Sequence, residues 1–385
     1  MILSVVIVSY NVKFFLEQCL SSLKKAIDGS AVLNSNTEVF VIDNASADGT
    51  IDFLKPLFPD FRFIQNKINT GFAKANNQAV SLSKGDFVLF LNPDTIVAED
   101  SLDICISFFK TMPDAGAVGL KMIDGAGNYL EESKRGFPTP AVSFYKMTGL
   151  TRLFPRSKFF SGYYLGHIHQ DSPHSIDVLP GAFMMIRKTI IDMIGGFDEQ
   201  FFMYAEDIDL SFRIKQIGYQ NYYLPQSSII HFKGESTRRD IKYVKVFYNA
   251  MELFIKKHFT DNYSSIHLYI LKLGIRFRQV LARFQLRFEK SAKKPASPIR
   301  IFVKGAENEK QSWKIRLDKK KIFVVENQME ANEILFCEGP DLSWKSIITE
   351  ITNNKNSHVY KFHGTGTHSA VGSDSSRRQG DIFEI

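Results

Sequence analysis

Short hydrophobic runs alternate with polar, helix-like stretches over roughly the first third of the chain. The hydrophobic runs are rich in β-branched and aromatic residues, as strands buried on both faces are. The predicted strands are Val5–Val8, Val39–Ile42, Phe61–Ile64 and Phe87–Leu91. The predicted helices between them are Phe14–Ala26, Thr50–Phe58 and Ala73–Leu82. This alternation predicts an α/β fold with a mostly parallel sheet and helices on both sides.

Polar residues gather where the predicted strands end. Such sheets bind ligands at the carboxyl ends of their strands. A glycine turn before a helix start adds free backbone N–H groups, which suit an anion such as a phosphate. The candidate nucleotide-binding residues in these loops are Ser9, Tyr10, Asn11, Asp43, Asn69, Gly71, Asn76 and Asn92. Any one loop is explained by ordinary turn chemistry, whereas four such loops at one edge favour a binding site.

An acidic cluster follows the aromatic segment Phe201–Tyr204. It places Glu206, Asp207 and Asp209 within four residues. Loss of solvent beside aromatic rings and mutual repulsion both raise the pKa of a carboxylate, as a general base often requires. The alternative is a solvated helix start, because acidic residues also suit helix N-termini.

Residues 125–178 are less regular and contain several glycines, prolines and aromatic residues. We expect a loop or lid over the acceptor side of the site. Strand character returns at Leu179–Arg187.

The basic charge of the chain is concentrated between Arg238 and Lys294, and the pattern becomes helical from about Asp240. The formal net charge is +7 for the whole chain. Within Ile270–Phe288 an apolar stripe around Phe277 is flanked by basic residues. This flank comprises Lys272, Arg276, Arg283, Arg287, Lys290 and Lys294. Such a helix suits an anionic membrane surface; the alternative is a helix packed on protein with a solvated basic side.

The remainder of the chain predicts a small α/β unit after a linker at Lys293–Pro298. Its expected strands are Ile299–Val303, Ile322–Val325, Glu333–Cys337, His358–Phe362 and Ser369–Val371, with a helix at Leu342–Ile351. The fragment Gly364–Gly366 is more typical of a plain loop than of a phosphate-binding motif. We therefore divide the chain into 1–255, a basic helical segment at 256–296, and a unit of unassigned role at 297–385.

The cysteines and the hydropathy of the sequence indicate the cellular compartment. Cys19, Cys105 and Cys337 lie far apart and make neither a metal motif nor a disulfide framework, which favours a reducing cytoplasm. The N-terminus runs directly into a strand without a leader, and no long uncharged apolar stretch predicts a membrane span. We expect a cytoplasmic protein, with peripheral contact to the inner membrane face through the basic helix.

Several motifs together resemble a family-two glycosyltransferase of the GT-A fold, close to rhamnosyltransferase-like members. They are VVIVSYN, VIDNASADGT, NTGFAKANN, FLNPDT, LPGAFMMIRK, GGFDEQFFMYAEDIDLSFR and HFKGES, in this order. Each motif is weak, whereas their order and spacing are specific. The resemblance implies transfer of a sugar, with inversion, from a nucleotide-diphosphate donor to an acceptor hydroxyl on a glycan or a lipid-linked glycan.

The resemblance also implies roles for individual residues. Asp43 matches the position that holds the nucleotide base, and Asp207 matches the catalytic base. Asp94 matches the metal-binding acid of an Asp-x-Asp motif whose first position is here Asn92, and His231 completes the metal site. On the acceptor side the resemblance implies Gly181 and Glu206. The implied cofactor is Mg²⁺ or Mn²⁺, which neutralises the departing diphosphate.

Two other functions stay open at this point. A sugar-phosphate nucleotidyltransferase shares the nucleotide-binding architecture, but we find no glycine-rich N-terminal loop with Arg and Lys for a triphosphate. A scaffold that binds nucleotide or membrane without catalysis is disfavoured because Asp43, Asp94, Asp207 and His231 are all present. The expected partners are a nucleotide sugar, an acceptor glycan and an anionic membrane surface, and no nucleic acid.

Overall fold

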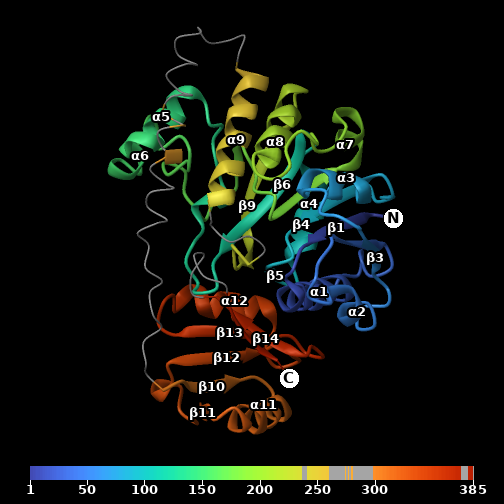
Figure 1. Ribbon diagram of the computed structural model, residues 1–385, viewed down its shortest axis with the longest axis vertical. Helices are drawn as coiled ribbons and strands as arrows, with labels where there is room; N and C mark the ends of the chain where they lie inside the picture. The colour runs from blue at the N-terminus through green and yellow to red at the C-terminus, as the bar shows by residue number, and fades with distance from the viewer. Residues whose placement is uncertain are drawn as a thin grey trace.

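The computed structural model describes residues 1–235, 241–259, 274, 276, 279, 280, 298–373 and 380–384. Two sheets organise these residues (Figure 1). The first sheet has nine strands and the second has six. The second sheet lies at one end of the molecule, beside the first helix (Figure 1).

The strands of the first sheet follow the order β3-β2-β1-β4-β8-β6-β9-β5, and β7 pairs with β9. Their bounds are β1 Leu3–Ser9, β2 Thr37–Asp43, β3 Arg62–Gln65, β4 Phe87–Leu91, β5 Thr95–Val97, β6 Ala115–Ile123, β7 His174–Ile176, β8 Phe183–Arg187 and β9 Gln220–His231. Strands β1 to β4 are parallel, as expected. Beyond β4 the sheet is mixed, because β8 runs antiparallel to both β4 and β6. The chain leaves β6 and enters β8 at the same edge, and the segment between them includes β7, which pairs with Asn221–Tyr223 near the start of β9.

Helices cover both faces of this sheet. Their bounds are α1 Lys13–Asp28, α2 Thr50–Leu54, α3 Phe72–Val80, α4 Ser101–Thr111, α5 Pro140–Thr148, α6 Leu150–Leu153, α7 Lys188–Ile194, α8 Glu206–Gln216 and α9 Ile241–His258. On β1, Val5 and Ile7 pack in the core beneath α1 and α4, whereas Val6 and Val8 pack in the core beneath α3 and α7. Successive side chains of a strand face opposite sides, so a strand covered on both faces is apolar throughout.

The C-terminal sheet has the order β11-β10-β12-β13-β14-β15. Its elements are β10 Arg300–Lys304, α11 Glu307–Lys319, β11 Phe323–Val324, β12 Glu333–Cys337, α12 Trp344–Asn353, β13 Val359–His363, β14 Ser369–Gly372 and β15 Asp381–Glu384. The sequence pattern did not predict α11. Only Trp313 and Leu317 of this helix are buried, so it lacks the apolar stripe that marks an amphipathic helix.

The two sheets share a hydrophobic cluster. Phe15 and Phe232 from the first unit pack with Phe336 and Phe362 from the second. The contact continues in polar form, because the buried Glu17 of α1 accepts hydrogen bonds from the backbone of His368 and the hydroxyl of Ser369. The C-terminal unit is therefore packed on the sheet that carries the site.

Two predictions from the sequence concern membranes, an amphipathic helix on the membrane surface and the absence of a membrane-spanning helix. The predicted amphipathic helix Ile270–Phe288 lies largely outside the described residues. Among the helices that are described, none combines the length and the hydropathy needed to cross a bilayer.

The three cysteines, Cys19, Cys105 and Cys337, are free and buried. Burial raises the pKa of the Cys19 thiol to about 12.

Candidate active site

A cavity of about 450 Å³ opens at the carboxyl edge of β1 and β4. Residues from the segment 124–182, from the start of α8 and from the end of β9 complete its wall. The predicted site residues that line it are Tyr10, Asn69, Asn92, Asp94, Gly181, Glu206, Asp207 and His231. The other predicted residues, which do not line it, are Ser9, Asn11, Asp43, Gly71 and Asn76.

Two buried polar groups lie side by side behind this cavity. Ser9 and Asp43 are register partners at the ends of β1 and β2. Oδ2 of Asp43 accepts a hydrogen bond from the backbone N–H of Ser46 at 3.1 Å. Within the described part of the chain, Oδ1 of Asp43 and Oγ of Ser9 have no partner. Burial raises the pKa of Asp43. Unsatisfied buried polar atoms at a strand edge fit a polar ligand.

Three predicted residues mainly shape the loops. Oδ1 of Asn11 accepts from the backbone of Ala47 at 2.7 Å, which ties the first loop to the second. Oδ1 of Asn69 accepts from the backbone of Gly71 at 3.0 Å. The amide of Asn76 donates to a carbonyl one helical turn earlier, at 2.9 Å. Turn chemistry, the alternative considered above, thus accounts for the contacts of Asn11 and Asn69, whereas Asn76 makes a contact within α3.

Asp94 and His231 meet at one wall of the cavity. Oδ1 of Asp94 lies 3.3 Å from Nε2 of His231. The β-sheet brings them together, because Thr95 of β5 is the register partner of His231 on β9. The amide nitrogen of Asn92 lies 3.4 Å from the same Nε2. Sequence positions 139 apart thereby become neighbours.

This pair fits a divalent cation bound in part by other ligands. Over the described residues, no group of three or more His, Cys, Asp or Glu side chains is placed to hold a metal ion. The protein therefore offers one carboxylate and one imidazole. Hard cations complete such a shell with water and with phosphate oxygens of the substrate. The buried Nδ1 of His231 has no partner within the described chain.

Glu235 connects this wall to the C-terminal sheet. Its carboxylate accepts a hydrogen bond from the backbone of Gly380 at 2.8 Å. Burial, together with the nearby charge of Asp94, raises the pKa of Glu235 to about 7. The C-terminal unit thus contacts the loop that follows His231.

A bend in the backbone before α8 places the first turn of this helix at the cavity wall. Tyr204 and Ala205 have φ angles of 70° and 63°, in the left-handed region that non-glycine residues seldom adopt. The carbonyl of Ala205 nevertheless accepts the backbone hydrogen bond of Asp209 at 2.9 Å, so the helix begins directly after the bend. Glu206 and Asp207 therefore line the cavity. Backbone strain of this kind is typical of functional sites.

Asp207 is held by three donors. Its Oδ2 accepts from Nη2 of Arg135 at 2.5 Å and from the backbone of Gly181 at 3.2 Å. Its Oδ1 accepts from the backbone of Ile208 at 2.8 Å. Asp207 is thereby positioned as an oriented carboxylate at the cavity wall.

The environment of Glu206 differs from that of Asp207, because its side chain has fewer hydrogen-bond donors. It is buried, and its Oε2 has no partner among the described residues. Burial and the neighbouring charge of Asp207 raise the pKa of Glu206 to about 8. At neutral pH, a protonated acid therefore stands next to a carboxylate.

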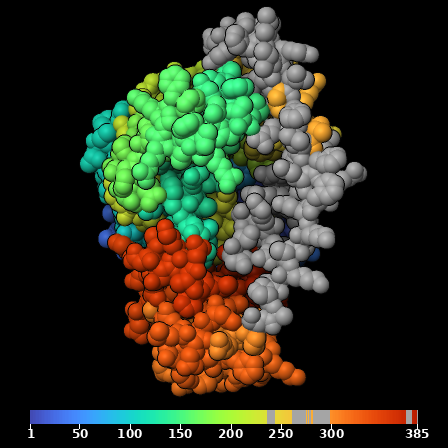
Figure 2. Space-filling model, turned by 90° about the vertical axis from the view of Figure 1, so that its left-hand side faces the viewer, coloured from blue at the N-terminus to red at the C-terminus, as the bar shows by residue number. Residues whose placement is uncertain are grey.

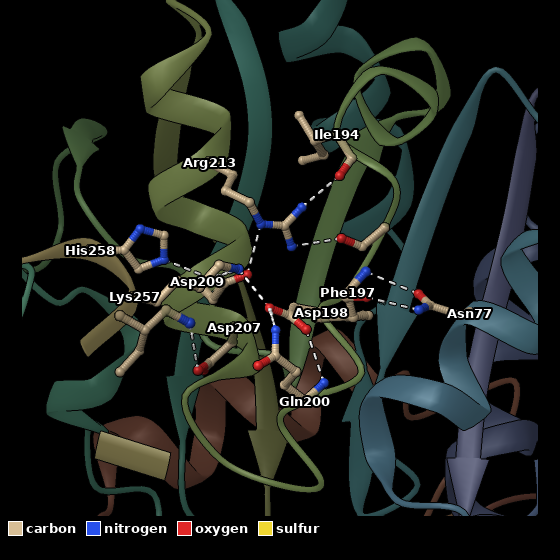
Figure 3. A network of polar contacts seen from close by, with 12 residues as sticks. Asn77, Ile194, Phe197, Asp198, Gln200, Asp207, Asp209, Arg213, Lys257 and His258 are labelled. Atoms are coloured by element: carbon tan, nitrogen blue, oxygen red, sulfur yellow. Dashed lines mark hydrogen bonds and ion pairs between the residues drawn. The ribbon is translucent and has the colours of Figure 1, made fainter. Parts of the chain in front are cut away.

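Asp209 is a structural anchor instead. Figure 3 shows the network around it. Its carboxylate accepts from Nε of Arg213, from Nζ of Lys257 and from Nε2 of His258, each at 2.7 Å. Burial favours its neutral form, but the hydrogen bond from His258 and the charge of Arg213 outweigh burial and lower the pKa of Asp209 to about 2. The contacts fasten α8 to α9.

The glycine pair before the acidic cluster has a local reason. Gly196 has a φ angle of 72°, and a Cβ atom there would lie 2.7 Å from Oδ1 of Asn77. The amide of Asn77 makes both backbone hydrogen bonds to Phe197, at 2.8 and 2.9 Å (Figure 3). A glycine therefore lets this loop close against α3.

A comparison with family models decides the class of the N-terminal domain. Residues 4–194 match the family described as Glycosyl transferase family 2. These residues are a family 2 glycosyltransferase domain. The topology described above agrees with this assignment and with the expected GT-A fold. Asp207 and His231 lie beyond the matched range, so their roles rest on the geometry.

Curated relatives of this glycosyltransferase include two rhamnosyltransferases. The N-acetylglucosaminyl-diphospho-decaprenol L-rhamnosyltransferase of Mycobacterium tuberculosis (strain ATCC 25618 / H37Rv) is 28% identical over 250 residues, covering 62% of this chain and 78% of the relative. Rhamnosyltransferase WbbL of Escherichia coli (strain K12) is 30% identical over 178 residues, covering 44% of this chain and 63% of the relative.

Solved structures resemble the glycosyltransferase more distantly. The S. aureus TarS 1–349 complex with UDP-GlcNAc is 18% identical with a TM-score of 0.47, covering 75% of this chain and 76% of TarS 1–349. Mannosyltransferase PcManGT from Pyrobaculum calidifontis, in complex with GDP-Man and Mn²⁺, is 16% identical with a TM-score of 0.48, covering 74% and 72%. This similarity is too low to transfer residue roles.

Sequence reasoning missed a basic and aromatic part of the site in the glycosyltransferase. Arg135, Lys146 and Tyr163 all come from the irregular segment 125–178 and line the cavity. Nζ of Lys146 lies 3.2 Å from the ring centroid of Tyr163. Lys233, from the HFKGES motif, forms an ion pair with Glu132 of the same segment. The segment has no periodicity to reveal them, and the adjacent Lys134–Arg135 pair was the only signal.

Proposed function

We propose that this glycosyltransferase transfers a sugar, with inversion, from a nucleotide-diphosphate donor to an acceptor hydroxyl, and that Asp207 is its general base. One observation carries the proposal: Asp207 and the Asp94–His231 pair line the same cavity of about 450 Å³. The strand ends suit the donor, as in other α/β sheets. Asp207 then faces the acceptor.

The reaction requires one base at this position. The acceptor hydroxyl gives its proton to a carboxylate oxygen of Asp207. At the same time, the hydroxyl oxygen bonds to the anomeric carbon of the sugar. The bond from that carbon to the diphosphate breaks, and its electron pair leaves on the phosphate oxygen. Base catalysis of this kind contributes ~10²–10⁴-fold.

The environment of Glu206 supports direct displacement. A covalent, retaining route would need a second, nucleophilic carboxylate close to the anomeric carbon. Glu206 is buried, and its raised pKa keeps it protonated at neutral pH. A protonated carboxyl group suits hydrogen-bond donation to an acceptor oxygen, not nucleophilic attack.

We further propose that Asp94 and His231 hold a divalent cation, Mg²⁺ or Mn²⁺. When bound, the ion neutralises charge on the departing diphosphate as a Lewis acid. An imidazole ligand favours Mn²⁺ over purely oxygen-preferring Ca²⁺. Asn92 replaces the first acid of the motif, so its amide contributes polarity at this wall without charge.

The acceptor we propose is lipid-linked or a growing surface glycan, used at the inner face of the cytoplasmic membrane. Two observations support this. The relative from Mycobacterium tuberculosis is named for a diphospho-decaprenol acceptor. In addition, the basic residues of this sequence are concentrated at 238–294, and basic segments are attracted to anionic bilayers.

A nucleotide-sugar panel tests the proposed function. Thermal shift of the full chain with Mn²⁺ identifies the donor, because a ligand of the folded state raises stability. Release of nucleoside diphosphate then measures turnover, and NMR of the product reports the anomeric configuration. We expect D207N to keep the thermal shift and to lose the turnover. Product of retained configuration, or turnover unaffected in D207N, contradicts the proposal.

A further inference from the structure

A second cavity, of about 1100 Å³, lies beneath α5 and α6. Lys146 and Tyr164 line both this cavity and the one that contains Asp207. The two spaces are therefore neighbours separated by shared side chains. A ligand whose reacting hydroxyl lies at Asp207 has room to extend into the second cavity.

The wall of this second cavity is basic. Four cationic side chains line it, Lys134, Lys146, Arg152 and Arg156, against a single carboxylate, Glu131. His167 and His169 line it as well. Fields from several cations in a concave wall add up and favour an anionic ligand.

Two of these cations are held without a carboxylate partner. Lys134 is only 3% exposed, and its ammonium donates to the carbonyls of Tyr164 and Leu165 at 3.3 and 2.8 Å. Across the residues the structure describes, no carboxylate forms an ion pair with Lys134 or Lys146. Burial lowers the pKa of both. A cation withdrawn from water is costly unless it is paired, so an anion in this cavity would relieve that cost.

Exposed apolar side chains surround the same helices. They are Phe144, Leu153, Phe154 and Phe159, with exposed fractions of 48%, 69%, 46% and 75%. Figure 2 shows the segment that carries them as the green, outward face above the C-terminal sheet. Apolar groups gathered at a polar rim mark binding surfaces. A basic cavity with an apolar rim matches an amphiphile that has an anionic head and a hydrocarbon tail.

We propose that the cavity beneath α5 and α6 binds the diphosphate of a polyprenyl-type lipid acceptor. The inference rests on the proposed function and specifies its acceptor site. Lys134, Lys146, Arg152 and Arg156 contact the diphosphate, and the sugar that follows it reaches Asp207. The hydrocarbon passes over the rim at Leu153 and Phe159. This arrangement separates the acceptor from the donor, which enters at the strand ends.

Vesicle binding by the full chain tests the charged wall. The probe is co-sedimentation with phosphatidylcholine vesicles, alone or containing either a polyprenyl diphosphate or phosphatidylglycerol. Arg152 and Arg156 are exposed, so R152Q/R156Q should fold normally. We expect the double variant to bind polyprenyl-diphosphate vesicles about tenfold or more weakly than the wild type, since each cation near an anionic headgroup contributes strongly. The matched control is K158Q, an exposed lysine of the same segment outside the cavity wall.

A second pair of variants tests the apolar rim. L153Q/F159Q should weaken binding to the same vesicles several-fold, because less apolar area leaves water. M329Q is the control, since Met329 is 91% exposed on the C-terminal unit. Equal loss in M329Q would overturn the role of the rim.

Two further measurements, binding to phosphatidylglycerol vesicles and hydrolysis of the nucleotide sugar, separate this inference from the proposed function. Equal wild-type binding to phosphatidylglycerol vesicles would mean general attraction to anionic membranes and would overturn the inference. No binding to polyprenyl-diphosphate vesicles would overturn it too. Nucleotide-sugar hydrolysis by the wild type without acceptor measures the proposed function separately. If the wild type hydrolyses no donor, the proposed function fails on its own, whatever the vesicles show.

Discussion

Arg135 and Asp207 lie 72 positions apart in the sequence, yet a guanidinium nitrogen of Arg135 donates to the Asp207 carboxylate at 2.5 Å. Arg135 belongs to the segment that crosses the cavity, whereas Asp207 opens α8. The contact therefore joins the cover of the site to the carboxylate proposed as base. It also means that a movement of this segment would change the charge environment of Asp207.

The first prediction concerns Asp207 itself. D207N removes the proton acceptor but keeps the shape of the side chain. We expect kcat to fall by at least ~10²-fold while donor binding is retained. Steady-state release of nucleoside diphosphate measures kcat, and thermal shift measures donor binding. D192N, which changes an exposed aspartate on α7 that pairs with Lys188, should leave both unchanged.

Asp209 offers a contrast within the same cluster. D209N would leave the cations of Arg213 and Lys257 without their buried carboxylate. Breaking a buried pair on one side costs ~3–5 kcal/mol. We expect urea unfolding to show this loss of stability. Wild-type stability in D209N together with a large fall in kcat would exchange the roles assigned to Asp207 and Asp209.

Arg135 should act through Asp207. R135Q removes the charged donor that fixes Oδ2 of Asp207. We expect kcat to fall by ~10-fold or more with donor binding retained, and R135K to recover part of the loss, because a displaced reacting group lowers the rate. Release of nucleoside diphosphate by the three proteins measures kcat, and thermal shift measures donor binding. A purely structural arginine would lower stability in both variants and leave the kcat of the folded protein unchanged.

Glu206 predicts a pH dependence of stability. Its pKa rises from 4.5 to about 8 through burial and the charge of Asp207. The folded state then keeps a proton that the unfolded chain releases, so this contribution is full below about pH 4.5 and is lost as pH rises through about 8. E206Q cannot ionise. We expect its free energy of unfolding, relative to wild type, to improve on the order of a few kcal/mol between pH 5 and pH 9.

Urea unfolding of both proteins across that range provides the test. Glu235 has a raised pKa as well, but it is present in both proteins, so its effect cancels in the difference. A difference between E206Q and wild type that stays constant with pH would show that Glu206 is not buried as a neutral acid.

The metal proposal has its own set of variants. D94A should abolish Mn²⁺-dependent donor binding, and H231A should weaken it less, because the carboxylate carries the charge. N92D restores the first acid of the motif and should tighten Mn²⁺ binding, since a second carboxylate can reach a hard cation. Calorimetry with Mn²⁺ and a nucleoside diphosphate measures these affinities. Full wild-type activity in excess chelator would refute the metal site.

Much of the cavity wall at the strand ends could be predicted from the sequence, because it depends on strands. Buried strands have a recognisable composition, and polar residues at their ends converge once the sheet is parallel. The pairing of Asp94 with His231 instead depends on the antiparallel strands β5 and β9, and it was expected only from the family resemblance. Arg135 and Lys146 could not be predicted: Arg135 lies in irregular chain, and Lys146 lies on the short helix α5, which no sequence pattern indicated. In the acidic cluster, the structural role of Asp209 could not be predicted. Its partners Lys257 and His258 come 48 and 49 residues later in the sequence.

The last prediction concerns the docking of the C-terminal unit on α1. Gln18 is buried, and its amide spans the contact. Its nitrogen donates to the hydroxyl of Thr367 and to the carbonyl of Ser369, each at 3.0 Å, and its oxygen accepts from the backbone of Gly364 at 2.8 Å. Q18L preserves the volume and leaves the Gly364 N–H without its acceptor, whereas the Thr367 hydroxyl and the Ser369 carbonyl keep other partners. Each unsatisfied buried group costs ~1–3 kcal/mol.

The two tryptophans of the chain make this contact measurable. Trp313 and Trp344 both belong to the C-terminal unit, so their fluorescence reports its unfolding, whereas circular dichroism reports both sheets. In Q18L we expect the fluorescence transition to move to lower urea than the dichroism transition, because the C-terminal unit loses its support first. Q78L, an exposed glutamine of α3, should leave both transitions in place. Coincident, unshifted transitions in Q18L would mean that the shared cluster of Phe15, Phe232 and Phe362 alone holds the two units together.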